Sequence, residues 1–500
     1  MTKPANQIDP RLSRSSKALA DADRWKQLAR RHPDGYYTLQ TEDTGAVPVR
    51  MFLTPSLFES AEDILYRQIV NATSFPGVRM VVITPDVHYG YGVPVGCVLI
   101  TDAENGAVAM GPVGYDIGCG MMSAKSDVPA NAATPEKRLQ FNRAVMQRVS
   151  MGAGGKSHRL GKVSQGEFYN LVRGGAEYYV EKYGATFDRG HAERHRIPVD
   201  DDWEIPWGGK GKPERGMDQL GSLGGGNHFI ELQRAEDTGT LFVQVHTGSR
   251  GFGHGLATNY FELARAKQPD QIRDIDLGYF TPDSKHYRDY LNAVAAGGNY
   301  AILNRLIIFE QVAEAFREVF AQDLELIYEI SHNLVQKEWH PEFGDVWVHR
   351  KGATRAFPAA HPALRGTKWE TTGHPVLIPG SNKDFSYILR PLAGAVKSGY
   401  SVNHGAGRRL SRNEARRRLS QRATDDEYAA AGILVNTDGH VPLDESAPCY
   451  KSSEEVVAAV IAAGLAQIEH KLSPLSSLKG TDERRSKVKK LPRQRSSAHF

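Results

Sequence analysis

Short apolar runs recur along the chain and predict buried β-strands. Each run is rich in Val, Ile and Leu and is bounded by polar or glycine-containing segments, which is the pattern of a strand inside a sheet. The predicted strands are residues 78–84, 95–100, 241–246, 325–331 and 345–349. Clusters that contain histidine follow several of these runs directly, so we expect polar chemistry at the strand ends.

Apolar residues at helical spacing predict helices between these strands. The predicted helices are residues 136–150, 256–268, 288–321 and 453–468. The third has a broad apolar face, which is typical of a half-buried helix. Residues 185–220 are rich in Gly, Pro and charge and predict a long excursion. Because strands and helices alternate irregularly, we expect a mixed α+β fold and not a doubly wound sheet.

Composition limits the class of protein. The 500 residues are 40% hydrophobic and 24% charged, which is typical of a soluble globular protein. The N-terminal segment has no apolar signal region, and no run approaches the roughly 18 apolar residues of a membrane span. Three cysteines cannot form a disulfide framework and fit a reducing compartment. We therefore expect a cytoplasmic protein that does not contact a membrane.

Positive charge is concentrated in two places although the formal net charge is only +4. Arginines crowd residues 408–418, and Lys and Arg are frequent in the last twenty residues. One interpretation is a solvated helix face followed by a disordered tail. The other is contact with a phosphate backbone.

Histidine and glycine recur together in short clusters. Glycine lets the backbone approach a ligand closely, so a histidine beside it can be presented to a metal or a phosphate. The clusters read PDVHYGYG (85–92), VGYDIGCG (113–120), LGGGNHF (223–229), VHTGSRGFGHG (245–255), ISHNLV (330–335) and VNHGAG (402–407). Their number suggests one polynuclear metal and phosphate site that is assembled from distant loops, as in an enzyme.

The candidate metal ligands are a carboxylate, a thiolate and three imidazoles. Asp116 and Cys119 lie three residues apart and can chelate one cation, and a thiolate sulfur can bridge two. His228, His246 and His332 each lie at or just after a predicted strand end. The alternatives are a tight turn with a buried cysteine and histidines that are only structural. These donors suit a transition metal without identifying it.

His404 is the candidate nucleophile. A neutral imidazole can attack phosphorus, and the phosphoramidate that forms can pass its group on. Arg408 and Arg412 follow it and could bind phosphates bidentately. The alternative is a histidine at a helix N-terminus with solvated arginines. Segments 379–381 and 348–358 could be nucleotide-contacting loops or ordinary surface turns.

Several common motifs are excluded. MGAGGKS (151–157) lacks the first glycine of a P-loop, because Ser150 stands there. HAERH (191–195) has the wrong order for a zincin. Cys97 lies inside an apolar run and is better interpreted as a small core residue.

Together the clusters resemble the RtcB family of RNA-splicing ligases. The resemblance spans roughly residues 48–480 and includes PDVHYGYGVPVG, GPVGYDIGCG, SLGGGNHFIE, VHTGSRGFG, HRKGATRAFP and NHGAGRRLSR. It implies an α+β fold with stacked sheets flanked by helices around a central cleft for metal and GTP. It also implies that the chain joins RNA ending in a 2′,3′-cyclic phosphate or 3′-phosphate to RNA beginning with a 5′-hydroxyl, in tRNA splicing or RNA repair.

The resemblance also implies roles for individual residues. Asp116, Cys119 and His228 match the ligands of one Mn²⁺ ion, and Cys119, His246 and His332 match those of a second. His404 matches the histidine that becomes guanylylated, and Arg250, Arg408 and Arg412 are candidates for the RNA phosphate. The residues that fall where the family holds the guanylate are Asn227, His228, Phe229, Ile230, Glu231, His332, Asn333, Pro379, Gly380, Ser381, Asn382, Ser386, His404, Gly405, Ala406, Gly407 and Lys479.

One segment departs from the family pattern. The chain reads GSNKDFS at 380–386 where relatives usually read GSMGT followed by a small or aromatic residue, so nucleotide preference or rate is open there. We expect a polar extension over 1–45, the catalytic domain over 46–480 and a basic, flexible tail over 481–500. RNA is the expected partner, with an archease-type activator as a further one. A metal-dependent RNA-end phosphoesterase and a non-ligating RNA-binding paralogue are the alternatives.

Overall fold

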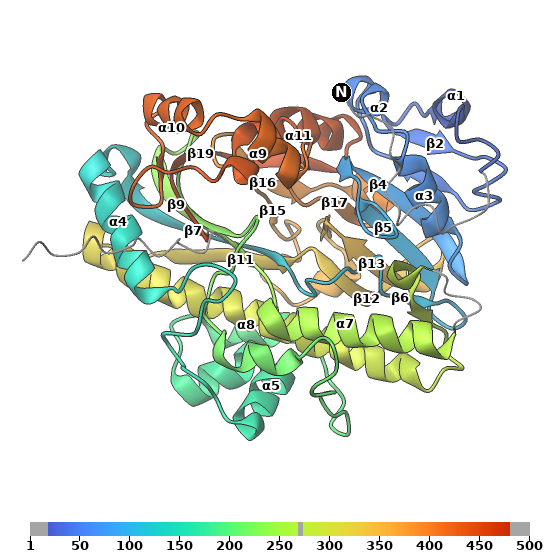
Figure 1. Ribbon diagram of the computed structural model, residues 1–500, viewed down its shortest axis with the longest axis horizontal. Helices are drawn as coiled ribbons and strands as arrows, with labels where there is room; N and C mark the ends of the chain where they lie inside the picture. Colours follow the sequence, from blue (N-terminus) through green and yellow to red (C-terminus); the bar gives the residue numbers. More distant parts are fainter. Residues whose placement is uncertain (1–18, 269–273, 481–500) are drawn as a thin grey trace, which may run out of the picture.

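Two β-sheets that pack face to face form the centre of the protein (Figure 1). The computed structural model describes residues 19–268 and 274–480. The first sheet has seven strands in the order β1 (Arg30–Arg31), β2 (Tyr37–Leu39), β3 (Val49–Met51), β4 (Val78–His88), β5 (Val95–Asp102), β13 (Gly344–Lys351) and β12 (Asn333–His340).

The second sheet has eight strands. Its order is β11 (Glu325–Ser331), β7 (Gly120–Pro129), β9 (Thr240–Thr247), β8 (Phe229–Ala235), β19 (Ala466–Lys479), β16 (Ser386–Pro391) and β15 (Val376–Ile378), with β18 (Leu434–Val435) beside β19. Two small ribbons pair β6 (Val108–Ala109) with β10 (Tyr279–Phe280) and β14 (Ala353–Arg355) with β17 (Ser401–Asn403).

Helices cover the outer faces of both sheets (Figure 1). They are α1 (Trp25–Leu28), α2 (Pro55–Glu59), α3 (Leu65–Thr73), α4 (Pro135–Arg148), α5 (Gln165–Tyr183), α6 (Arg189–His195), α7 (Arg250–Lys267), α8 (His286–Phe320), α9 (Arg412–Arg418), α10 (Gln421–Ala430) and α11 (Ser453–Ala462). Within the described ranges no helix is long and apolar enough to span a bilayer.

The core forms on both faces of the sheets. Side chains from α4, α5, α7 and α8 pack on the outer face of the eight-stranded sheet, and α2, α3 and α11 pack on the outer face of the seven-stranded sheet. A third cluster joins Val98 and Val348 of one sheet to Ile378 and Leu389 of the other. This arrangement confirms the mixed α+β fold and leaves the site between the two sheets.

All five predicted strands are present, as β4, β5, β9, β11 and β13. One helix prediction was wrong at its end: residues 453–468 form α11 only to Ala462, and Gly464 at φ 66° turns the chain into β19. Conversely, α7 begins at Arg250, six residues earlier than predicted. Glycine weakens a helix, but a Cβ at Gly255 would lie 2.6 Å from Pro213 Cα, so packing requires the glycine.

Helix α8 is buried more completely than a half-buried face predicts. It lies between the eight-stranded sheet and helices α4, α5 and α7, and polar side chains such as Asn299, Asn304 and Arg305 are buried along it. The sequence predicts a polar N-terminal extension over residues 1–45, and the structure describes this segment from residue 19 onward. Trp25 is buried and β1 and β2 continue the seven-stranded sheet. The predicted basic tail, 481–500, lies outside the described residues.

Candidate functional site

Strand alternation points the predicted ligands into the space between the sheets. Val243 and Val245 of β9 pack against the helices, so His246 lies on the opposite face with Phe242. Strand β8 alternates in the same way, which places Phe229 on the inner face and Ile230 in the helix-side core. A one-residue shift in register would exchange these faces.

The Asp116–Cys119 turn is fixed by close backbone packing. Gly118 adopts φ 76°, and a Cβ there would lie 2.7 Å from the Cβ of Ala301 on α8. The Gly118 amide donates to the carbonyl of Asn333 at 2.7 Å, and the His332 amide donates to the carbonyl of Cys119 at 2.7 Å. The turn is therefore bound to the segment that carries His332.

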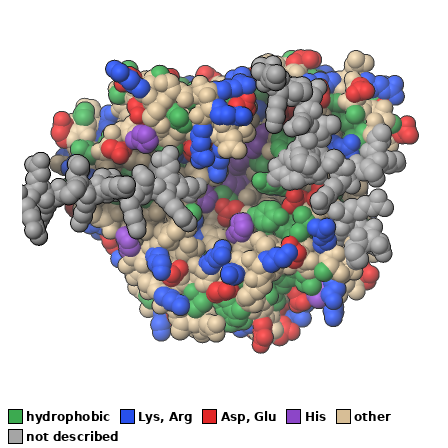
Figure 2. Space-filling view, in the orientation of Figure 1, with side chains coloured by type: hydrophobic (Ala, Val, Ile, Leu, Met, Phe, Trp, Pro, Cys, Tyr) green, Lys and Arg blue, Asp and Glu red, His purple; other side chains and the backbone are tan. Residues whose placement is uncertain are grey.

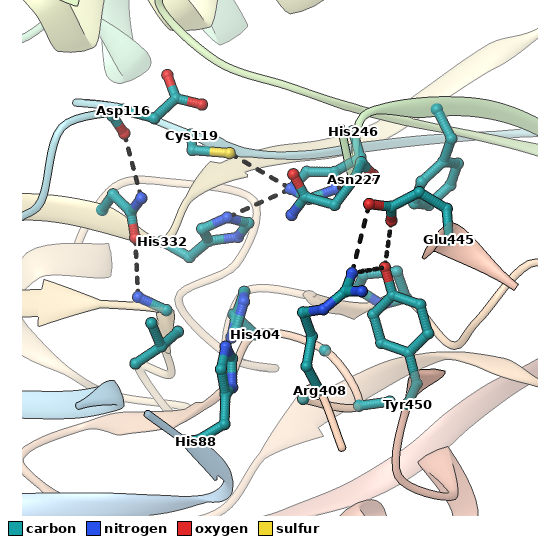
Figure 3. A pocket seen from close by; sticks show the side chains of 18 of the residues that line it. His88, Asp116, Cys119, Asn227, His246, His332, His404, Arg408, Glu445 and Tyr450 are labelled. Atoms are coloured by element: carbon teal, nitrogen blue, oxygen red, sulfur yellow. Dashed lines mark hydrogen bonds and ion pairs between the residues drawn. The ribbon is translucent and has the colours of Figure 1, made fainter. Parts of the chain in front are cut away.

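The five predicted ligands meet in one cluster. Figure 3 shows four of them, Asp116, Cys119, His246 and His332. Cys119 Sγ lies 3.4 Å from His246 Nε2 and 3.6 Å from His228 Nε2. His228 Nε2 lies 3.2 Å from Asp116 Oδ2, and His246 Nε2 lies 3.4 Å from His332 Nε2. The atoms form two groups of three, Asp116–Cys119–His228 and Cys119–His246–His332, and Cys119 is common to both.

Backbone carbonyls set the orientation of two of the imidazoles. His228 Nδ1 lies 3.0 Å from the carbonyl oxygen of Leu223, and His246 Nδ1 lies 3.2 Å from that of Asn227. A carbonyl only accepts, so each Nδ1 carries the proton and each Nε2 directs its lone pair into the cluster. Metal-binding histidines in proteins are held in this manner.

The charges of the cluster suit a cation. Burial lowers the pKa of His246 and His332, so both imidazoles are neutral. Burial would raise the pKa of Asp116, but interactions with His228, Cys119 and Arg250 together lower it to about 2. Burial and the Asp116 carboxylate raise the pKa of the Cys119 thiol. A bound cation would offset that rise, and two neutral imidazoles, a carboxylate and a thiolate then fit a transition metal.

A buried ion pair lies beneath the cluster. The guanidinium of Arg305 donates to Glu329 Oε2 at 2.9 and 3.0 Å. It also donates to the Gly118 carbonyl at 2.7 Å, the Thr247 carbonyl at 3.1 Å and Ser331 Oγ at 2.7 Å. These acceptors adjoin Cys119, His246 and His332 in sequence, so one side chain fixes three ligand-bearing segments. Sequence reasoning missed Arg305, although a charged residue in an apolar helical pattern was the available signal.

His404 lies beside the cluster and is oriented by Asp86. The two imidazole rings of His404 and His332 have centroids 4.8 Å apart. His404 Nδ1 donates to Asp86 Oδ2 at 2.6 Å, and the same oxygen accepts from the amides of His404 at 3.0 Å and Gly405 at 3.2 Å. Burial alone would raise the pKa of Asp86, but the His404 imidazole lowers it. The ionised Asp86 accepts the Nδ1 proton, so the neutral form of the His404 ring carries its lone pair on Nε2, as a nucleophile requires.

The cluster opens into a cavity of about 410 Å³. Figure 2 shows histidine side chains inside a hollow between the two halves of the molecule, with Lys and Arg at its rim. The cavity is lined by these predicted residues: Asp116, Cys119, Asn227, Phe229, His246, His332, Asn333, Pro379, Gly380, Ser381, Asn382, His404, Gly405, Ala406, Gly407, Arg408, Arg412 and Lys479. Residues as far apart in sequence as Asp116 and Lys479 thus line the same cavity.

Other predicted residues lie behind the wall. Ile230 points into the helix-side core. Glu231 and Ser386 are buried and share a partner, because Gln233 Nε2 donates to Glu231 Oε1 at 2.7 Å and to Ser386 Oγ at 3.1 Å. Burial raises the pKa of Glu231 to about 7. These side chains can support the wall but do not line the cavity.

The three candidate phosphate-binding arginines already have partners. Arg408 donates to Glu445 at 3.3 Å and to the Asp444 carbonyl at 2.6 Å, and Arg412 lies 3.4 Å from Glu445 (Figure 3). Arg250 donates to the carbonyls of residues 152 and 153 at 3.1 and 3.2 Å. Arg408 and Arg412 line the cavity, and Arg250 does not. Sequence reasoning missed Glu445. Its carboxylate forms ion pairs with Arg408, Arg412 and Lys479 and accepts a hydrogen bond from the Tyr450 hydroxyl.

The departing segment 380–386 is held by α10 and by its own side chains. Lys383 pairs with Glu427, and Ser381 Oγ donates to Asp384 Oδ2 at 2.9 Å. Tyr428 donates to the amide oxygen of Asn382, which fixes the side-chain amide of a residue that lines the cavity. Asn382 Nδ2 is buried and has no hydrogen-bond partner in the described chain, so it can donate to a bound molecule.

Comparisons of the sequence with a family model and with curated proteins agree on one family. Residues 68–480 match the model of the family described as tRNA-splicing ligase RtcB. A tRNA-splicing ligase RtcB of Pyrobaculum aerophilum is 35% identical over 468 residues, which cover 87% of this chain and 95% of the relative. An RNA-splicing ligase RtcB of Mycobacterium tuberculosis is 35% identical over 440 residues, which cover 83% of this chain and all of the relative.

Proposed function

This chain belongs to the RtcB family and is an RNA ligase, and we propose that it joins RNA ends with GTP, two Mn²⁺ ions and a histidine–GMP intermediate. The expected ends are a 2′,3′-cyclic phosphate or 3′-phosphate and a 5′-hydroxyl, in tRNA splicing or RNA repair. The observation that carries the proposal is the placement of His404. Its Nδ1 proton is held by Asp86, and its ring lies 4.8 Å from that of His332 at the cavity wall.

The first transfer would use the free lone pair of His404. Nε2 attacks the α-phosphorus of GTP, a nitrogen–phosphorus bond forms, the bond to the β-phosphate oxygen breaks, and pyrophosphate leaves. The imidazole gains positive charge in this step, and the carboxylate of Asp86 stabilises that charge through the Nδ1 hydrogen bond.

The later steps would return His404 to its starting state. Water opens a cyclic phosphate to the 3′-monophosphate before transfer. The 3′-phosphate oxygen then attacks the phosphoramidate phosphorus and expels the imidazole, which leaves RNA capped with GMP. The 5′-hydroxyl attacks the 3′-phosphate, a phosphodiester forms, and GMP departs with the electron pair. Each step is phosphoryl or nucleotidyl transfer, in which positioning and charge neutralisation carry the catalysis.

Asp116, Cys119, His228, His246 and His332 would hold the Mn²⁺ pair. When bound, the ions would neutralise phosphate charge and polarise phosphoryl oxygens. The shared Cys119 supports two ions because the two groups of ligand atoms meet only at its sulfur. Asn227, Asn333, Lys479 and residues 379–382 would contact the guanylate from the cavity wall, with Glu231 and Ser386 behind them.

RNA would approach along the basic rim. Arg408 and Arg412 line the cavity, and exchange of their Glu445 contacts for phosphate would free both guanidinium groups for RNA. An archease-type activator remains a prediction. The cytoplasmic location also remains a prediction, supported by the free thiols of Cys97, Cys119 and Cys449.

Incubation with α-labelled GTP and Mn²⁺ tests the proposal. We expect a protein-bound label that is acid-labile and base-stable, is absent in His404→Ala, and moves to RNA when a 3′-phosphate is added. Opening of a cyclic phosphate without a protein adduct would indicate a phosphoesterase instead. The absence of both activities would indicate a non-ligating RNA-binding paralogue.

A further inference from the structure

A second cluster of potential metal ligands lies outside the cavity, and two of its three members lie in the segment predicted as an excursion. Asp188 caps α6 by accepting from the amide of His191 at 2.6 Å. His191 and His195 lie one turn apart on α6, with ring centroids 4.1 Å apart and an interplanar angle of 16°. Residues four apart share a helix face, so both rings face the same way. That face meets Glu329 of β11, which pairs with His195 Nδ1.

The carboxylate of Glu329 divides its oxygens between two partners. Oε2 accepts both bonds from Arg305, while Oε1 faces the histidines. One ring nitrogen of His191, one of His195 and one oxygen of Glu329 lie within 4.8 Å of one another. Glu329 Oε1 can therefore offer an electron pair to a cation beside the two histidines while Oε2 keeps its bonds from Arg305.

A hydrogen bond alone does not account for the cluster. It explains His195 and Glu329, but His191 Nε2 is buried and has no hydrogen-bond partner among residues 19–268 and 274–480. A buried ring nitrogen without a partner is unfavourable, because it has lost its hydrogen bond to water without a replacement. No step of the proposed ligase reaction uses His191.

We propose that His191, His195 and Glu329 bind a zinc-class divalent ion at a site separate from the cluster around Cys119. Two imidazoles and one carboxylate are a common set of three protein ligands for Zn²⁺, with a small molecule in the fourth position. A cavity of about 120 Å³, lined in part by His195 and Glu329, has room for that fourth ligand. Arg194 and Arg355 line the same cavity, so an anion such as hydroxide fits the fourth position.

The ion would join the excursion to the strand that leads to the catalytic cluster. Helix α6 lies in the segment 185–220. Glu329 belongs to β11, which ends directly before the metal-ligand candidate His332. Glu329 is also linked through Arg305 to the Gly118 carbonyl. The expected role is structural, because none of the three ligands lines the 410 Å³ cavity.

Zinc stoichiometry tests this site. The full chain is stripped with chelator, dialysed against Zn²⁺, and assayed for bound metal by mass spectrometry. We expect wild type to retain one ion more per chain than the double variant His191→Ala, His195→Ala, whatever the occupancy at Cys119. The matched control is His158→Ala, an exposed histidine outside both clusters, which should bind as wild type does.

A second variant guards against misfolding. His191→Gln keeps a polar side chain of similar size, so it should retain the wild-type circular dichroism spectrum and lose one ion. Zn²⁺ should also raise the Tm of wild type more than that of His191→Gln. Equal zinc content in wild type and His191→Gln would overturn the site. Loss of more than one ion would also overturn it, because the effect would then extend to the cluster around Cys119.

Discussion

Replacing Asp86 by Asn tests whether the carboxylate prepares His404 for attack. Asp86 Oδ2 accepts from His404 Nδ1 at 2.6 Å and from two backbone amides at 3.0 and 3.2 Å. The amide of Asn is nearly the same size but is neutral, so a bond from Nδ1 to its oxygen lacks the charge of the carboxylate. Asp86→Asn should therefore keep the fold and weaken the stabilisation of the imidazole charge that develops during transfer.

The expected loss in guanylylation rate follows from the charged hydrogen bond between His404 and Asp86 that the variant replaces. A hydrogen bond to a charged group contributes about 1.5–3 kcal/mol. At about 1.4 kcal/mol per factor of ten, the rate of His404 guanylylation should fall roughly 10- to 150-fold. Thr84→Val is the matched control, because Thr84 Oγ1 donates to the other oxygen of Asp86 at 2.6 Å. Loss of that donor leaves the charged bond to His404 in place, so it should slow the reaction less than Asp86→Asn does.

The assay is single-turnover transfer from α-labelled GTP to the protein, quenched in alkali because the adduct is acid-labile. Metal content and circular dichroism are measured on the same samples. A rate for Asp86→Asn within twofold of wild type, with metal content intact, would refute the orienting role. A slower rate accompanied by loss of metal would also refute it, because Asp86 would then act through the cluster.

Three further predictions address the cluster, the buried carboxylate and the tail. Cys119→Ala removes the shared donor of both ligand groups, so metal content, ligation and cyclic-phosphate opening should all be abolished; full ligation by this variant would refute the bridging role. Burial raises the pKa of Glu231 from 4.5 to about 7, so its ionisation destabilises the folded state progressively as pH rises from 4.5 to 7. By chemical denaturation Glu231→Gln should match wild type near pH 4 and be more stable by up to about 3 kcal/mol at pH 8, whereas a pH-independent difference would contradict this. Deletion of residues 481–500 should reduce the slope of log Kd against log salt for single-stranded RNA by roughly 0.7 for each phosphate that the tail neutralises, with guanylylation unchanged; an unchanged slope would exclude the tail from RNA binding.

Much of the site was predictable because its chemistry lies in local strings. Asp116 and Cys119 share one glycine-rich turn, and His246 and His332 lie at the ends of apolar runs that predict strands. The strands β4, β5, β9, β11 and β13 were predicted because alternation and β-branched residues act over a few neighbouring positions. The resemblance to a family then supplied the roles, which the residues alone left open.

Residues that act through distant partners could not be predicted. Asp86 stands two residues before His88 in one of the histidine-containing clusters, yet its partner His404 is 318 positions away. Arg305 lies in an apolar helical pattern that does not reveal its partners, and no local motif marks Glu445. The start of α7 was not predicted because packing against Pro213 overrides the low helix propensity of its glycines.

Local patterns of residues established which donors are available and which strands and helices carry most of them. The packing of distant elements placed Cys119 between two groups of ligands, turned Ile230 to the core and Phe229 to the cavity, and brought His191 to Glu329. Local patterns set the geometry of one element, whereas sheet register and helix packing set the distances between elements. Those distances decide whether two side chains can share one ion or one proton.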